Sequence, residues 1–498
     1  YDFYIFGSLA TIISTKFFPS DNPTAAFLST LATFAAGFVV RPFGALFFGR
    51  LGDLIGRKYT FMVTLILMGG ATFLIGCIPS YETIGFMAPT LVLVLRLLQG
   101  LALGGEYGGA ATYVAEHAGS GKRGYWTSWI QTTATIGLFV SLMVIMATKS
   151  AMTKEAFEDW GWRVPFWVSI LMILVSYLIR KNMSESPEFA KVKAEGKTSK
   201  NPLKESFGHK LNFKFVLLAL FGIVMGQGVV WYTGQFYAMS FIEKVMGLSD
   251  QVGDIMMYAI LMATPFFVFF GWLSDKIGRK WLMLAGILIA VVAYRPIYRA
   301  MYETTSIKNK TEIEAKTVVV AETKENKTKA LDSVYTTTKE YTDGATWKEV
   351  KTVTLENGVA KIGDDGKPKI EIKKTMVVID SDKWTLVWLV FIQIFLVTVV
   401  YGPTAAFLVE LFPAKIRYTS MSLPYHIGNG IFGGLLPAVA TSLVAAATKA
   451  NDAAAEAGQA VAVAEPYLQG LWYPIIIGAV CFIIGAIYVD GKSTAHKQ

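Results

Sequence analysis

Two copies of one charged motif divide the chain into similar halves. The pattern G-x-L-x-D-x-I-G-R-K occupies residues 49–58 and returns at residues 271–280, each time between long apolar runs. A second pair of signals repeats in the same order, because Glu116 precedes Arg123 by seven residues and Glu410 precedes Arg417 by seven. A charged hairpin repeated between apolar segments is typical of a two-halved membrane transporter.

Composition places the chain among proteins that cross a membrane many times. Of its 498 residues 53% are hydrophobic and only 17% are charged, and the mean hydropathy is +0.45. A helix needs about 20 apolar residues to cross hydrocarbon ~30 Å thick. Twelve segments meet this requirement: 1–18, 25–48, 59–78, 88–115, 126–148, 164–178, 213–242, 255–273, 281–301, 384–411, 421–447 and 467–489. The first begins at Tyr1 without a leading Met, so we expect the first helix to be truncated.

The spacing of the repeats exposes an insert in the second half. Residues 303–383 are polar and rich in Lys, Glu and Thr, a composition that does not enter hydrocarbon. Alternating runs at 317–321, 349–355 and 369–379, with Asn-Gly at 357–358 and Asp-Gly at 365–366, are strand and hairpin signals. We expect either a small β module or a flexible linker. The predicted organisation is 1–180, a six-helix bundle; 181–212, a linker; 213–302, helices seven to nine; 303–383, the insert; and 384–498, helices ten to twelve and a tail.

The formal net charge of +9 reports membrane orientation and not nucleic-acid binding. If helices alternate in direction, both G-R-K hairpins and the linker, with nine Lys or Arg between 180 and 214, fall on one side of the membrane. The positive-inside rule assigns that side to the cytoplasm. The prediction is therefore cytoplasmic termini and an extracytoplasmic insert.

Several strings resemble the metabolite:proton symporter branch of the major facilitator superfamily, which includes proline/betaine, α-ketoglutarate, citrate and shikimate carriers. They are Y-D-F at 1–3, R-P-F-G at 41–44, R-L-L-Q-G at 96–100, G-G-E-Y-G-G at 104–109, W-Y-T-G-Q-F at 231–236 and F-G-G at 432–434. Two features depart from the branch: His426 follows Tyr425 where Asn is more usual, and the long insert is not general. The resemblance implies an all-α fold of two six-helix bundles in a bacterial inner membrane, expected to be monomeric.

The hairpin charges are predicted to act at the ends of helices. Asp53 lies where a carboxylate can bind the first backbone amides of a neighbouring helix. The resemblance implies a cytoplasmic gate in which ion pairs form only while that side is closed. Its residues would be Asp53, Arg57, Glu116 and Arg123 in the first half and Asp275, Arg279, Glu410 and Arg417 in the second. The alternative is that these charges only fix loop topology. Neither copy carries the phosphate-loop pattern of an ATP-driven pump.

Ionisable residues inside predicted spans are functional candidates, because each costs roughly 2.5–3.5 kcal/mol to insert. Our hypothesis is that Asp2 or Glu106 carries a transported proton while Arg41 holds a carboxylate of the substrate or the vacated carboxylate. The alternative is a permanent ion pair between their helices. Arg96 lies nearer the outer side, where it either attracts substrate or extends to the interface. Glycines 100, 104 and 108 form a small-residue face for close helix packing.

Polar side chains on apolar helices are candidates to line a central cavity, and we expect about half of them to do so. They are Gln131, Gln227, Tyr232, Gln235, Gln393 and Tyr401. His426 titrates near neutral pH and either couples protons or serves as a hydrogen-bonding spacer.

These features predict a secondary active transporter that couples a proton gradient to import of a small organic acid or zwitterion by alternating access. An uncoupled facilitator or exchanger is the closest alternative, followed by a sensor whose insert binds an external ligand. We expect no enzyme, since metal-ligand clusters and nucleophile motifs are missing from the sequence. The coupling ion is a proton, and no cofactor or metal is expected.

Overall fold

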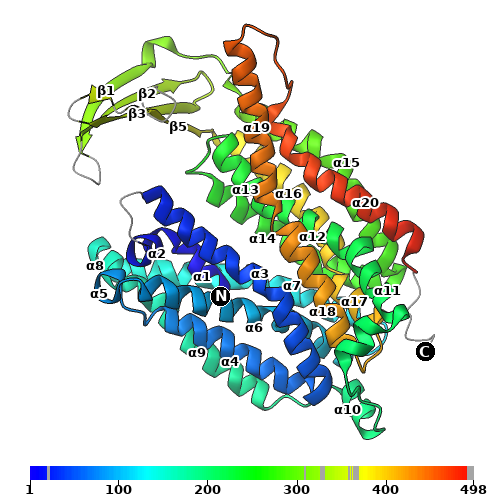
Figure 1. Ribbon diagram of the computed structural model, residues 1–498. Coiled ribbons are helices and arrows are strands. Elements are labelled where there is room, and N and C mark those ends of the chain that lie inside the picture. The colour runs from blue at the N-terminus through cyan, green and yellow to red at the C-terminus, as the bar shows by residue number, and fades with distance from the viewer. Residues whose placement is uncertain are drawn as a thin grey trace.

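The computed structural model describes residues 1–18, 23–307, 310–325, 331–356, 359–360, 362 and 370–490. Most of these residues are helical, and the helices gather into two groups (Figure 1). The N-terminal half, blue to cyan in Figure 1, contains α1 to α9, and the C-terminal half, green to red, contains α11 to α20. The short helix α10 (Pro187–Ala194) lies in the linker between them.

The helices of the N-terminal half are α1 (Asp2–Ser8), α2 (Ala10–Phe17), α3 (Pro23–Ile55), α4 (Arg57–Ile75), α5 (Tyr81–Ile84), α6 (Met87–His117), α7 (Arg123–Ser150), α8 (Lys154–Asp159) and α9 (Val164–Lys181). Those of the C-terminal half are α11 (Lys210–Ala219), α12 (Met225–Tyr232), α13 (Ala238–Ser240), α14 (Val252–Ile277), α15 (Arg279–Thr305), α16 (Asp380–Tyr401), α17 (Thr404–Leu411), α18 (Arg417–Ile427), α19 (Leu436–Glu456) and α20 (Trp472–Tyr488). Short 3-10 turns occupy Gly161–Arg163, Glu314–Lys316 and Pro466–Leu471.

Several helical stretches of the C-terminal half are π-helical. They are Leu220–Val224, Thr233–Tyr237, Phe241–Val245 and Gly428–Gly433, and a further one, Lys204–Gly208, lies in the linker. A π turn adds a residue per turn and rotates the side chains that follow, which is why such turns often occur at functional sites.

Within the described residues, ten helices are long and apolar enough to cross a membrane. They correspond to the last ten of the twelve expected segments. The first expected segment divides at Leu9 into α1 and α2, because the backbone there has φ −107° and ψ 12°. The second forms the 33-residue helix α3, which continues into the first hairpin. Twelve spans therefore remain a prediction.

Both charged motifs form the same tight turn between two helices. Gly56 joins α3 to α4 with φ 125°, and Gly278 joins α14 to α15 with φ 92°. Residues with side chains are strained at such angles, so the glycine of each G-R-K sequence is required by its backbone. We call the end of the molecule that carries these two turns the hairpin end.

Glycines on α6 bring it against α3, as the small-residue face predicted. A Cβ atom on Gly100 would lie 2.1 Å from the carbonyl oxygen of Gly37, and one on Gly104 would lie 2.2 Å from that of Arg41. A Cβ on Gly108 would meet the hydroxyl of Ser422, in the other half, at 2.1 Å. The stripe thus packs α6 within its own half and also against α18.

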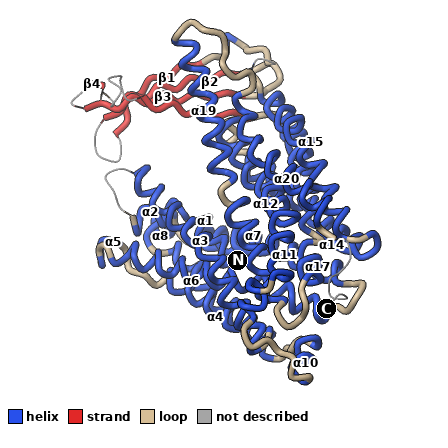
Figure 2. Tube along the Cα trace, turned by 45° about the vertical axis from the view of Figure 1, so that its right-hand side comes forward, coloured by secondary structure: helices blue, strands red, loops and turns tan. Residues whose placement is uncertain are grey.

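The insert forms a five-stranded antiparallel sheet. Its strands are β1 (Val318–Glu325), β2 (Leu331–Glu340), β3 (Thr346–Glu356), β4 (Val359–Ala360) and β5 (Ile370–Val377), in the order β1-β2-β3-β4 with β5 also beside β3. The strands expected from alternation are present, whereas the turn signals at 357–358 and 365–366 lie outside the described residues. In both views the sheet projects from the end of the C-terminal half that lies away from α10 (Figures 1 and 2).

Hydrogen bonds and ion pairs attach the sheet to the C-terminal half. Met376 donates its backbone N–H to the carbonyl of Gly247 at 2.8 Å. The side-chain amide of Gln251 bonds both the N–H and the carbonyl of Val378, each at 2.9 Å. Lys310, in the insert, pairs with Asp382 at the start of α16 at 2.9 Å. These contacts hold the base of the sheet to α14, α16 and the loop before α14.

Candidate functional site

The carboxylate of Asp53, in the N-terminal half, forms hydrogen bonds with the C-terminal half. It accepts backbone N–H bonds from Tyr418 at 3.3 Å and Thr419 at 2.8 Å, in the first turn of α18. An anion at this position satisfies amides that have no partner within the helix and complements the helix dipole. The predicted contact between Asp53 and a neighbouring helix is therefore present.

The second hairpin makes the equivalent contact in the opposite direction, from the C-terminal half to the N-terminal half. Asp275, at the end of α14, accepts backbone N–H bonds from Gly124 and Tyr125, both at 2.8 Å, in the first turn of α7. Arg279 holds this carboxylate with a 2.9 Å ion pair and donates to Glu410 at 2.6 Å. Each half thus presents a carboxylate to a helix start in the other half, and these contacts close the hairpin end.

A buried ion-pair network lies beside the first hairpin. Arg57 pairs with Asp53 at 3.1 Å and with Glu116 at 3.3 Å, and all three side chains are fully buried. Arg417 reaches across from α18 to Glu116 at 2.7 Å. A further bond crosses the halves, because Arg57 donates to the carbonyl of Ala414 at 2.6 Å.

The linker helix α10 completes this network, which the sequence analysis did not foresee. Glu188 pairs with both Arg123 of the N-terminal half and Arg417 of the C-terminal half, the latter at 2.5 Å. Ser186 donates to Glu116. Arg57 pairs with Glu116 and Arg279 with Glu410 within their own halves, whereas Arg417 joins Glu116 of the first half instead of Glu410. The signal available in the sequence was the S-E-S-P-E string at residues 184–188, which carries two acids.

Asp2 lies within the N-terminal half, on α1, where it is hydrogen-bonded to a neighbouring helix. Its carboxylate accepts a 2.7 Å bond from the hydroxyl of Ser169 on α9. The Ser169 side chain is fully buried and contributes this donor from inside the bundle. A carboxylate on one helix held by a hydroxyl on another suits a group that changes its protonation state without large movement.

Glu106 has a different partner from the one considered in the sequence. It pairs with Arg180, near the end of α9, at 3.4 Å. Arg180 also donates to the carbonyl of Phe61 at 2.6 Å and lies over the Phe61 ring at 3.5 Å. From the sequence, Arg180 was assigned to the basic linker because it follows the apolar segment. In the structure its side chain reaches Glu106.

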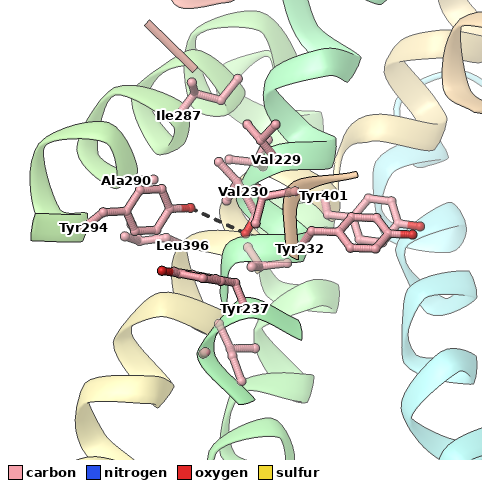
Figure 3. Packing of buried hydrophobic residues seen from close by; sticks show 14 of the residues in the cluster. Val229, Val230, Tyr232, Tyr237, Ile287, Ala290, Tyr294, Leu396 and Tyr401 are labelled. Carbon is pink, nitrogen blue, oxygen red and sulfur yellow. Dashed lines mark hydrogen bonds between the residues drawn. The ribbon is translucent and has the colours of Figure 1, made fainter. Parts of the chain in front are cut away.

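Arg41 lies in α3 where the two halves meet. Its guanidinium lies over the ring of Phe38, 3.9 Å from the ring centre. Tyrosines of both halves lie at this junction: Tyr4 of α1 and Tyr401 of α16 line one cavity, and Tyr232 and Tyr401 both pack beside Trp231. Figure 3 shows Tyr232 and Tyr401 on the opposite side of the C-terminal core from Tyr294.

Arg41 and Arg96 line one small cavity within the N-terminal half. Arg96 is 2% exposed, lies over the ring of Phe6 and donates to Gln99 at 2.6 Å. The side-chain amide of Gln99 in turn donates a hydrogen bond to the hydroxyl of Thr72 at 2.7 Å. The cavity also touches Gly37, Met68, Gly100 and Leu103. Two guanidiniums at one cavity suit an anionic solute group.

Aromatic side chains join the halves at the same level. Tyr107 of α6 stacks on Tyr425 of α18 with ring centres 3.6 Å apart and planes inclined by 5°. Gln131 donates to the hydroxyl of Tyr107 at 3.1 Å, and Tyr401 shares a hydrogen bond with Tyr425. The stack therefore joins α6 of one half to α18 of the other.

A second cavity lies between the halves, with an empty volume of about 410 Å³ including its open mouth. Its lining mixes aromatic, amide and aliphatic side chains, the composition of a small-molecule site. Of the predicted cavity residues it contains Gln131, Gln235 and Tyr401. Further lining residues are Tyr4, Ala134, Thr135, Leu138, Trp231, Ile260 and Phe267.

Two of the remaining predicted polar residues bond to neighbouring helices, whereas Tyr232 packs its ring against Trp231 and Phe236. Gln227 on α12 exchanges two hydrogen bonds with Asn429, at 2.9 and 3.2 Å. Gln393 on α16 donates to the sulfur of Met301 at 3.3 Å. His426 on α18 is 3% exposed, with its ring centre 5.1 Å from that of Tyr425. Among the described residues, no group of three or more His, Cys, Asp and Glu is arranged to hold a metal ion.

Comparison with known proteins identifies the family. Residues 1–208 and 181–321 match the family described as "Sugar (and other) transporter". The chain belongs to this transporter family. It is therefore a membrane transporter of the major facilitator superfamily, not an enzyme.

Similar curated proteins carry small metabolites. The chain is 28% identical over 448 residues to the citrate-proton symporter of Klebsiella pneumoniae, covering 89% of this chain and 82% of that protein. It is 34% identical to the alpha-ketoglutarate permease of Escherichia coli K12, covering 61% and 69%. It is 33% identical to the proline/betaine transporter of the same strain, covering 60% and 61%.

The fold of this transporter matches solved structures of the superfamily. A proton:xylose symporter bound to 6-bromo-6-deoxy-D-glucose aligns with a TM-score of 0.64 at 13% identity, over 99% of this chain and 94% of that one. At this identity the match concerns the fold alone.

Proposed function

We propose that the protein is a proton-coupled symporter that moves a small organic acid or zwitterion by alternating access. The observation that carries this proposal is the cavity between the halves, which Tyr4 and Gln131 line from the N-terminal half and Gln235 and Tyr401 line from the C-terminal half. A solute carboxylate bound there would contact the two halves at once, so its binding would depend on how they are arranged. The relatives named for citrate, alpha-ketoglutarate and proline/betaine all carry solutes with carboxylates.

Asp2 and Glu106 are the proposed proton carriers in the N-terminal half. Each is a carboxylate within the bundle with a single described side-chain partner, Ser169 for Asp2 and Arg180 for Glu106. Intramembrane carboxylates with polar partners are the usual elements of proton pathways. Arg96 is proposed to attract the anionic solute from the cavity that it shares with Arg41.

The proposed orientation places the hairpin end in the cytoplasm. The basic hairpins and linker favour that side by the positive-inside rule, which places the insert outside and both termini inside. In this arrangement twelve helices cross the inner membrane of a bacterium, in a monomer, and the hairpin contacts form the cytoplasmic gate.

Uptake into proteoliposomes tests the function. The purified protein would be assayed with an imposed pH gradient, acidic outside, against radiolabelled citrate, α-ketoglutarate, shikimate, glycine betaine and proline. Accumulation of at least one solute above equilibrium, abolished by a protonophore, supports symport. Equilibration that ignores the pH gradient identifies a facilitator, and exchange alone identifies an exchanger; either result contradicts the proposal.

A further inference from the structure

The lining of the cavity between the halves is uncharged. Among the described residues, no Asp, Glu, Lys, Arg or His lines it, and it shares no lining residue with the small cavity of Arg41 and Arg96. A solute with two or three carboxylates would bury its charges there without a cation to compensate them, which is unfavourable. A zwitterion has no net charge, so neutral groups of suitable polarity can stabilise each of its ends.

Two hydrogen-bond donors without a protein partner lie close together in this lining. Trp231 is in the last turn of α12, and Gln235 is in the π turn at Thr233–Tyr237 that follows. Within the part of the chain that the structure describes, neither the indole N–H of Trp231 nor the side-chain amide of Gln235 has a hydrogen-bond partner, and both side chains are partly exposed. A carboxylate is a pure acceptor that such N–H groups stabilise. These two side chains therefore suit the carboxylate of a solute.

Aromatic rings give the same cavity a surface of the opposite polarity. The ring centre of Tyr401 lies 6.3 Å from that of Trp231 and 6.1 Å from that of Phe267 on α14, with planes inclined by 61° and 76°. Tyr4 of α1 adds a ring from the N-terminal half. In Figure 3 the hydroxyl of Tyr401 points toward the cyan helices of that half. The face of an aromatic ring carries partial negative charge and attracts cations, quaternary ammonium groups in particular.

The absence of an acidic group from the described lining limits which ammonium the cavity accepts. A primary ammonium carries three N–H donors and is strongly hydrated, so its burial requires several acceptors, of which a carboxylate is the most effective. A quaternary ammonium carries methyl groups and no N–H. Aromatic and aliphatic side chains alone can therefore surround it.

We propose that the solute of this cavity is a zwitterion that joins a carboxylate to a methylated quaternary ammonium. The carboxylate accepts N–H bonds from Trp231 and Gln235, and the ammonium lies against the rings of Phe267 and Tyr401. Tyr4 closes the site from the other half, so this solute contacts both halves. The inference rests on the proposed function, whose solute class it narrows.

Calorimetric titration of the full-length protein in detergent tests the solute class without transport. The ligands are glycine betaine, glycine, citrate and 3,3-dimethylbutyrate, which has the shape of glycine betaine with carbon in place of the charged nitrogen. Glycine betaine is expected to bind at least about tenfold more tightly than each of the others, because it alone joins a carboxylate to a cation that aromatic rings accept. Equal or tighter binding of any of the others, or no binding of glycine betaine, overturns the inference.

Two variants locate the ends of the solute. Phe267→Leu removes a ring and keeps an apolar side chain, so it is expected to lower the preference for glycine betaine over 3,3-dimethylbutyrate by about fivefold or more. Gln235→Leu removes a carboxylate donor, so it is expected to weaken both ligands by the same factor and keep that preference. Phe269→Leu is the matched control, since Phe269 is on the same helix, 47% exposed and outside the lining. A preference that Phe267→Leu leaves unchanged contradicts the proposed site, and the ligand series in wild-type protein decides the solute class even if a variant fails to fold.

The proteoliposome assay separates this inference from the proposed function. Gradient-driven accumulation of citrate or α-ketoglutarate by a protein that does not bind glycine betaine supports the proposed function and overturns the inference. Binding of glycine betaine without gradient-driven accumulation of any solute supports the inference and contradicts the proposed function. Gradient-driven accumulation of glycine betaine, with the expected order of affinities, supports both.

Discussion

The carboxylate of Asp53 and the backbone N–H of Thr419 are joined by a 2.8 Å hydrogen bond although they lie 366 residues apart in the chain. The bond links the first hairpin to the start of α18, and Asp275 makes the matching link to α7. The two halves therefore exchange equivalent contacts, and loss of either weakens the closed hairpin end.

Asp53→Asn is expected to open the hairpin end more often. The substitution removes a buried charge that accepts two backbone bonds, at a cost of about 1–3 kcal/mol to the closed state. Such a cost raises the open population by about 5- to 150-fold. A cysteine replacing buried Ser422, in a background without Cys77 and Cys481, would report this as faster labelling by a membrane-impermeant maleimide. Asp275→Asn is the matched variant, and unchanged labelling in both would contradict the gate.

Asp2→Asn is expected to abolish gradient-driven uptake while sparing solute exchange. The amide cannot take up and release a proton, yet it retains an oxygen that accepts the bond from Ser169. Ser169→Ala, which removes the donor and keeps the carboxylate, should retain gradient-driven uptake with a displaced pH optimum. Full concentrative uptake by Asp2→Asn would remove Asp2 from the proton path.

Gly100→Ala is expected to destabilise the N-terminal half by about 1–3 kcal/mol, as overpacking in a tight core does. The added methyl would lie 2.1 Å from the carbonyl oxygen of Gly37, a backbone atom that cannot rotate away. Gly70, also in a helix, provides the control, because a Cβ there meets nothing within 4 Å. Gly70→Ala should leave stability unchanged or raise it by about 0.5–1 kcal/mol. Thermal unfolding in detergent measures both, and equal midpoints would argue against close packing of α3 and α6.

Docking of the insert is expected to be independent of pH between about 5 and 9. Burial raises the pKa of Asp343, but the hydrogen bonds from Lys310 and from the backbone N–H of Ala345, together with the charge of Lys310, hold that pKa below its ordinary value. A depressed carboxyl pKa stabilises the fold above the unfolded value of about 3.9 and loses this effect as the pH falls through the folded value. Burial lowers the pKa of Lys310, but its bonds to Asp343 and Asp382 raise it overall, so its contribution is lost only as the pH rises above about 10.4.

Spin labels on Thr354 in β3 and Lys449 in α19 would measure this docking as a distance distribution. The distribution should stay narrow from pH 9 to pH 5 and broaden below about 4. Asp343→Asn should broaden it at neutral pH, whereas Glu349→Gln, which loses only a 3.7 Å pair with exposed Lys374, should not. A distribution that broadens between pH 5 and pH 9 would point to other anchoring groups.

The sequence predicts the contacts that arise from local residue patterns or from the repeated motif. The hairpin glycines, the carboxylate of Asp53 at a helix start and the strands of the insert follow from a repeated motif, helix polarity and residue alternation. The break of the first helix at Leu9 follows Gly7 and Ser8, a weak helix-breaking signal inside a continuous apolar run.

Contacts between segments far apart in the chain were harder to predict. Glu188 pairs with Arg417 because the linker folds back against the C-terminal half. Arg180 reaches Glu106 because α9 continues past its apolar residues. The stacking of Tyr107 on Tyr425 depends on how two bundles are rotated against each other. Hydropathy and residue spacing do not encode that rotation.

The described bonds of the β sheet reach only the C-terminal half, through Gly247, Gln251 and the start of α16. An antibody fragment raised against the strands would therefore be fixed rigidly to one bundle without contacting the solute path. Such a reagent adds mass to a small, mostly buried particle and marks the direction of that bundle in projection images. This sheet, attached to one bundle, thus makes the protein favourable for imaging each step of the transport cycle.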